Sequence, residues 1–209
     1  MRMSVLAVLA AAAIGAAGCT NNGSATPSPS PTPPPATSAA AGQVAACLVG
    51  TWQSTSVAGM AGVSGGSGVR LTIAADGTTT TDFTSMQPIT FAVKIAETNV
   101  KGRFMYSGEA SGKIRTESPT ATSGKWEPSG SIDWSKVKVT AELTEPVSAK
   151  PADNLPIRDF LGDKSSQTGG VVDIDPLLGA GTYACEGTTT LILTPQDTSG
   201  LKWTLTRRP

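Results

Sequence analysis

The chain has 209 residues, among them 16 Lys and Arg, 16 Asp and Glu, and no His. Because it has neither net charge nor a basic cluster, the sequence argues against nucleic acid as a partner. The lack of His removes His-based catalytic triads and the usual zinc and copper sites, so we expect no metal and no cofactor.

Residues 1–18 have the layout of an export signal. Arg2 supplies a positive charge, and residues 5–14 form an apolar run that is too short for a transmembrane helix of about 20 residues. The Ala-Ala-Gly-Cys run that ends at Cys19 resembles the lipobox of bacterial lipoproteins. That resemblance implies that Cys19 is acylated and anchors the protein to the outer face of the cell membrane. The alternative is ordinary cleavage at the same small residues, which would release a soluble protein.

Residues 19–45 are expected to form a disordered tether. They are rich in Pro, Ser and Thr and have no apolar face to bury, which favours polyproline II. At about 3.1 Å per residue, the tether would reach on the order of 70 Å. This segment predicts a spacer that holds a domain clear of the membrane.

The first strands are predicted from alternation and turn signals. Residues 69–73 alternate between apolar and polar, and Asp76-Gly77 separates them from residues 78–83. An Asp-Gly pair between two strand-like runs is a strong hairpin signal. We therefore expect an antiparallel pair at this point of the chain.

Later segments are expected to be strands with local irregularities. In residues 103–115 every second residue is apolar or Gly, and Gly108 and Gly112 would allow a barrel wall to bend. In residues 132–143 the alternation changes phase near Ser135, which predicts a bulge. The last strands are expected at residues 183–193 and 201–205, and a short helix at residues 157–161.

These elements predict an all-β domain over residues 46–209. Eight to ten strands with mostly short connections favour a single antiparallel up-and-down β-barrel, and a closed sandwich is the alternative. Residues 145–181, rich in Pro, Gly and Asp, are expected to form one long loop. We expect a monomer.

The cysteines indicate one disulfide. If Cys19 is acylated, Cys47 and Cys185 remain, and an oxidising compartment would join them and tie the two ends of the domain together. The alternative is a pair of unpaired, buried thiols.

Gly50-Thr51-Trp52 resembles the G-x-W signature of lipocalins and related calycin barrels. The resemblance implies that Trp52 closes the base of the barrel and that a basic residue near the end of the last strand packs across it. Arg207 occupies that place and would form a cation–π contact. The family also implies a small apolar ligand inside the barrel, although it includes members with filled interiors that bind nothing.

If the interior is hollow, Phe104, Tyr106 and Trp134 are the expected ligand-binding residues, and the alternative is that they fill the core. The sequence thus predicts a membrane-anchored lipoprotein that binds a lipid or another small apolar molecule. The alternative is a non-catalytic structural or protein-interaction lipoprotein with a filled barrel. We expect no enzymatic activity, because no acid–base constellation is visible.

Two groups of carboxylates are candidate functional sites. Asp173 and Asp175 are spaced for a shared ligand such as calcium, but surface acids on a loop are far commoner. Glu109, Glu117 and Glu127 could in principle supply a glycosidase pair, and nothing in their spacing favours that over a solvated face.

Overall fold

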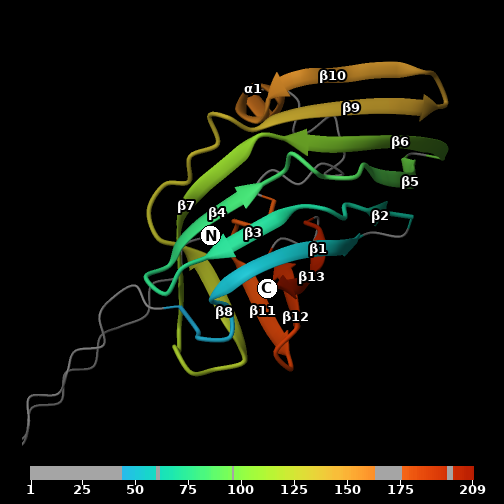
Figure 1. Cartoon of the computed structure of the whole chain (residues 1–209). Coiled ribbons are helices and arrows are strands. Elements are labelled where there is room, and N and C mark those ends of the chain that lie inside the picture. Colours follow the sequence, from blue (N-terminus) through green and yellow to red (C-terminus); the bar gives the residue numbers. More distant parts are fainter. Residues whose placement is uncertain (1–43, 60–61, 96, 163–175, 197–199) are drawn as a thin grey trace, which may run out of the picture. The chain divides into compact units, whose positions relative to one another are not determined.

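The computed structural model describes residues 44–59, 62–95, 97–162, 176–196 and 200–209 (Figure 1). The predicted signal, Cys19, most of the tether and the Asp173–Asp175 pair lie outside the described residues. Within the described part of the chain, no helix is both long enough and apolar enough to cross a membrane.

The described residues form thirteen strands and one short helix, of which the first seven strands come before residue 117. These are β1 Gly50–Ala58, β2 Ser64–Gly65, β3 Arg70–Ile73, β4 Thr78–Asp82, β5 Ile89–Ile95, β6 Thr98–Ser107 and β7 Glu109–Thr116. The remaining elements are β8 Ser123–Pro128, β9 Lys138–Glu145, β10 Ala149–Pro156, α1 Ile157–Gly162, β11 Gly181–Glu186, β12 Thr190–Pro195 and β13 Lys202–Arg208.

Eight antiparallel strands close into a barrel in the order β1-β13-β12-β11-β8-β7-β4-β3, which confirms the predicted all-β barrel. Buried side chains alternate with exposed ones along its strands, as at Leu71 and Ile73 of β3 and at Leu191 and Leu193 of β12. This alternation is what the period of two requires of a sheet with one face turned inward.

The structure also contains a second sheet, in the order β10-β9-β6-β5-β2. The sequence did not predict that these strands form a sheet apart from the barrel. The chain leaves the barrel after β1 for the two-residue β2 and returns at β3. It leaves a second time after β4 to form β5 and β6, and returns at β7. It leaves again after β8 for β9, β10 and α1, and returns at β11. The barrel strands therefore do not all follow one another in the chain (Figure 1).

The predicted bend in residues 103–115 occurs at Gly108, which separates β6 from β7 and carries the chain from one sheet to the other. Gly108 has φ of 88°, and a Cβ there would collide with the carbonyl oxygen of Lys136. Only glycine tolerates both conditions, because it has no Cβ and populates positive φ freely. Gly112 lies within β7 without interrupting it.

Two local predictions are wrong. Instead of a bulge near Ser135, the chain makes one bridge between Asp133 and Ser111, then a turn held by Asp133 Oδ1, which accepts a hydrogen bond from the Ser135 amide. The predicted long loop contains β10, which pairs irregularly with β9. Pro151 and Pro156 made this segment look like a loop in the sequence. Proline is tolerated here because β10 lies at the edge of its sheet. The short helix is confirmed as α1.

The core runs through both sheets. The largest of its side chains, each less than 2% exposed, are Trp52, Trp203, Tyr106, Phe83, Phe104, Leu48, Leu71, Ile73, Ile89, Ile114, Ile157 and Leu178. Residues 44–49, just before β1, add Val44, Ala45 and Leu48 to this core. The end of the predicted tether is thus part of the folded domain from residue 44 onward.

Candidate functional site

The base of the barrel is built around Trp52. Its indole is 1% exposed and donates a hydrogen bond from Nε1 to the Leu48 carbonyl oxygen at 2.7 Å. In the sheet register Trp52 lies opposite Leu71 of β3 and Arg207 of β13. The Arg207 guanidinium lies over the indole ring, 4.2 Å from its centroid. This is the cation–π contact that the resemblance to the G-x-W signature implied.

Arg207 also binds the chain segment that precedes β1. Its Nη1 and Nη2 donate to the carbonyl oxygens of Val49 and Cys47 at 2.7 and 2.8 Å, and its Nε donates to that of Thr188 at 2.8 Å. A Cβ on Gly50 would collide with Nη1, and Gly50 has φ of 134°. The glycine of the G-x-W motif is therefore what lets the guanidinium reach both carbonyls.

The predicted disulfide is confirmed. Cys47 and Cys185 are bonded across 138 residues, with their Cα atoms 6.3 Å apart, and the bridge joins the segment before β1 to β11. Tyr183 lies two residues earlier on the same strand, and its hydroxyl donates to the Ala121 carbonyl oxygen at 3.4 Å. Burial raises the pKa of Tyr183 above its ordinary value, so this phenol is neutral at physiological pH.

The three predicted ligand-binding residues are all buried: Phe104, Tyr106 and Trp134 are 1%, 0% and 3% exposed. Phe104 and Tyr106 lie on β6 of the second sheet with their ring centroids 5.7 Å apart, and Phe83 packs edge-on against Tyr106 at 5.4 Å. The Trp134 ring instead lies under the Arg158 guanidinium, at 5.4 Å. These side chains contribute to the packed core.

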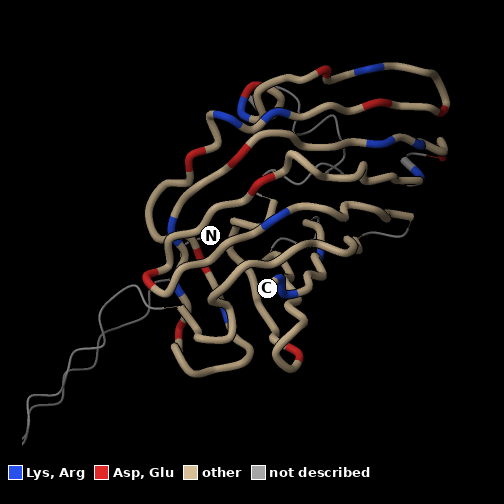
Figure 2. The backbone as a smooth tube through the Cα atoms, viewed as in Figure 1, with Lys and Arg blue, Asp and Glu red and all other residues tan. Residues whose placement is uncertain are grey.

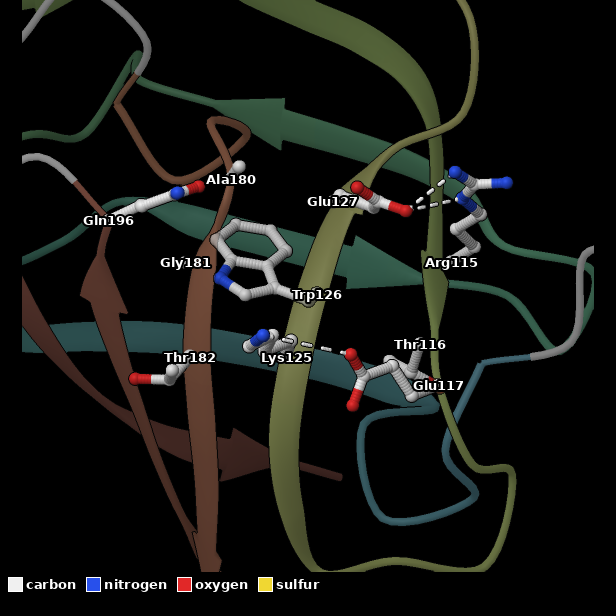
Figure 3. Close-up of a pocket in the computed structure, with 10 residues that line it drawn as sticks. All are labelled: Arg115, Thr116, Glu117, Lys125, Trp126, Glu127, Ala180, Gly181, Thr182 and Gln196. Atoms are coloured by element: carbon white, nitrogen blue, oxygen red, sulfur yellow. Dashed lines mark hydrogen bonds and ion pairs between the residues drawn. The ribbon is translucent and has the colours of Figure 1, made fainter. Parts of the chain in front are cut away.

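A surface groove lies where β7, β8 and β11 run side by side, and its volume is about 530 Å³ (Figure 3). It is lined by Arg115, Thr116, Glu117, Lys125, Trp126, Glu127, Ala180, Gly181, Thr182 and Gln196. Its volume falls in the range of small-molecule sites, roughly 300–1,000 Å³.

Two ion pairs cross from β7 to β8 along this groove. Arg115 contacts Glu127 with Nη2 at 2.6 Å and donates to it from Nε at 2.8 Å, and Lys125 contacts Glu117 at 4.0 Å. The Trp126 indole extends toward Gly181 on β11 (Figure 3). Thr182 also lies on β11, and Gln196 follows the end of β12. The charged side chains therefore line the outer face of β7 and β8, whereas the Trp126 side chain belongs to the buried core.

Trp126 is 3% exposed, and its Nε1 has no hydrogen-bond partner among the described residues. Gly181 is its register partner on β11, and a Cβ on Gly181 would lie 2.9 Å from this nitrogen and still closer to the Thr194 carbonyl oxygen. Gly181 thus leaves the space that the indole edge occupies.

This groove is not apparent from the sequence, which favours a solvated face for Glu117 and Glu127. The sequence does indicate the ion pairs, because every second residue in 113–117 and 125–127 is charged. When β7 pairs with β8, charged residues of the two strands lie opposite one another. That register depends on a loop whose geometry the sequence did not specify.

Charged residues elsewhere are also distributed in pairs of opposite sign. Blue and red positions are interspersed over the chain in Figure 2, and in the second sheet Arg103 pairs with Glu142 and Lys101 with Glu145. Among the described residues, no group of three Cys, Asp or Glu could hold a metal ion.

No family model, no curated protein and no solved structure matches this chain. The resemblances to lipoproteins and lipocalins therefore rest on the motifs at Cys19, at Gly50 and Trp52, and at Arg207. They stay predictions.

Proposed function

We propose that this chain is a membrane-anchored lipoprotein of the cell envelope, monomeric and non-catalytic, which binds its partner through the outer surface of a filled barrel. The export signal, the lipobox-like run at Cys19 and the Pro-rich tether support export and attachment to the membrane. A disulfide between Cys47 and Cys185 suits an oxidising compartment.

The proposal that the barrel holds no ligand rests on the packing of its interior. A barrel that holds an apolar ligand needs an enclosed cavity lined by apolar side chains. Here the side chains of Leu71, Leu191 and Leu205, which lie on barrel strands, are fully buried within the hydrophobic core. The groove on β7, β8 and β11 opens instead on the outer wall, where charged side chains line it beside apolar surface.

If the barrel instead held a small apolar ligand, the purified protein would contain it, and native mass spectrometry would detect the added mass. We expect the mature protein, purified from a host with a cell envelope, to have the mass of the unliganded chain, and organic extraction to yield no lipid. We also expect no uptake of an apolar fluorescent probe, because filled interiors leave no dry space for it.

A stoichiometric lipid that is lost from Tyr106→Trp, while that variant keeps its folded circular-dichroism spectrum, would reverse this conclusion. It would favour a small apolar ligand held at Phe104, Tyr106 and Trp134. The exposed Lys138→Ala variant of β9 serves as a control, because its side chain lies on the solvent side of the sheet.

The anchor is tested separately through Cys19. Metabolic labelling with an alkyne analogue of palmitate is expected to mark the protein in the membrane fraction. Cys19→Ser should lose the label and move to the soluble fraction, because one or more acyl chains would supply the whole attachment. Cys47→Ser is the control and should keep the label. A wild-type protein that is unlabelled and soluble would instead support ordinary cleavage and secretion.

A further inference from the structure

Residues 44–49, which we call the base strap, lie at the base of the barrel without pairing in either sheet. They form a turn in which the amides of Leu48 and Val49 donate to the carbonyl oxygens of Ala45 and Ala46. The Leu48 side chain is fully buried in the hydrophobic core. The base strap therefore belongs to the folded domain through packing and not through strand pairing.

The hydrogen bonds of the base strap to the rest of the domain join single groups. The carbonyl oxygens of residues 47–49 accept hydrogen bonds from the Arg207 and Trp52 side chains. The amides of Ala45 and Ala46 donate, both at 2.9 Å, to the end of β7 and to the loop that follows it. A segment held in this way opens at a lower free energy than the paired strands of a core.

The barrel closes without the base strap. β1 pairs directly with β3 from Gly50 onward and with β13 from Thr51 onward. Gly50 separates the base strap from β1 and has φ of 134°, a region that glycine populates freely. The base strap can therefore move away from the base without any strand leaving its sheet.

The Cys47–Cys185 disulfide links the base strap covalently to β11. While this bond is intact, Cys47 stays beside β11, and contacts that open around it form again. When the bond is cut, the backbone of the base strap regains its conformational freedom on release, and this entropy opposes the burial of its side chains. Both cysteines are only partly buried, so a small reductant can approach their sulfur atoms.

We infer that the base strap is a redox-dependent latch: a dithiol that reduces the Cys47–Cys185 disulfide releases residues 44–49 from the base while the barrel stays folded. One thiolate of the dithiol attacks a cysteine sulfur, and the second thiol resolves the mixed disulfide. The dithiol becomes a cyclic disulfide, and its two electrons and two protons leave Cys47 and Cys185 as thiols. Release would uncover the Trp52 indole, whose Nε1 now donates to the Leu48 carbonyl oxygen.

Hydrogen exchange followed by ¹H–¹⁵N NMR tests this inference at single amides. The sample is the mature chain with Cys19→Ser, which leaves only the two cysteines of the bridge, and the reductant is dithiothreitol. We expect the amides of Ala45 and Ala46 to exchange at least about 100-fold faster after reduction, with little dependence on added denaturant, because the opening is local. Amides of the β3–β4 ladder should remain at least about 100-fold more protected than those of the base strap.

Two variants separate the covalent bond from the other contacts. A chain in which Cys47 and Cys185 are both replaced by Ser should show the same fast exchange without dithiothreitol. Arg207→Ala removes hydrogen bonds to the base strap but leaves the disulfide intact. Its base strap should therefore stay more protected than that of the reduced chain.

The latch would be disproved if the base strap stayed as protected after reduction as before it, or if the β3–β4 amides lost their protection together with it. It would also be disproved if Arg207→Ala released the base strap with the disulfide intact. The inference goes beyond the proposed function and can fail separately. A lipid in the native mass spectrum would remove the proposed function and leave the latch, whereas slow exchange in the reduced chain would remove only the latch.

Discussion

Replacing both Cys47 and Cys185 with Ser is expected to lower the free energy of unfolding by about 4–5 kcal/mol, because the bridge closes a very long loop in the unfolded chain. The sequence separation is 138 residues. The bridge also fixes the segment before β1, which carries Leu48 and Ala45 into the core. Denaturation in guanidinium chloride, followed by circular dichroism, measures this change through the midpoint and the slope.

The control for the disulfide is the variant Cys19→Ser, because Cys19 is not part of the bridge. Its soluble mature chain should unfold at the same denaturant concentration as a mature chain with Cys19 present and reduced. A loss of less than about 1 kcal/mol in the double Ser variant would contradict the loop-closure account.

Arg207→Ala is expected to lower the free energy of unfolding by about 3 kcal/mol, from the loss of hydrogen bonds with a charged donor and of a cation–π contact. The side chain bonds to the carbonyl oxygens of Cys47, Val49 and Thr188, and lies over Trp52. Arg207→Lys should recover only part of the loss, because an ammonium cannot reproduce the planar fork. Chemical denaturation with tryptophan fluorescence measures both.

The neighbouring Arg208 gives a matched control. Its side chain is exposed and bonds to Gln53 on the outside of the barrel, so Arg208→Ala should change stability by no more than about 0.5 kcal/mol. If both Ala variants lost the same free energy of unfolding, the stability would depend on the positive charge of the C-terminal strand and not on the contacts that Arg207 makes.

Both predictions concern the point where the chain enters the folded domain. The disulfide, Arg207 and the Trp52 indole all hold residues 47–49, and Arg207 and Trp52 do so through backbone carbonyls.

Much of the local structure could be predicted from the sequence, because it depends on neighbours in the chain. The alternation in residues 69–73 predicted β3, the Asp76-Gly77 turn signal predicted that β4 follows it, and the glycine at 108 marked the bend. The disulfide followed from counting cysteines. The contact between Trp52 and Arg207 could be expected because the resemblance of Gly50-Thr51-Trp52 to the G-x-W signature implied it.

The tertiary structure alone decided which strands belong to which sheet. A period of two says that a strand has a buried face, but it does not say which strand lies beside it. That is why β6 reads as part of the barrel when its rings Phe104 and Tyr106 pack in the second sheet, and why the prolines of β10 read as loop. The groove depends on the same long-range choice. Trp126 meets Gly181 across 55 residues because β8 pairs with β11, and no local pattern specifies that pairing.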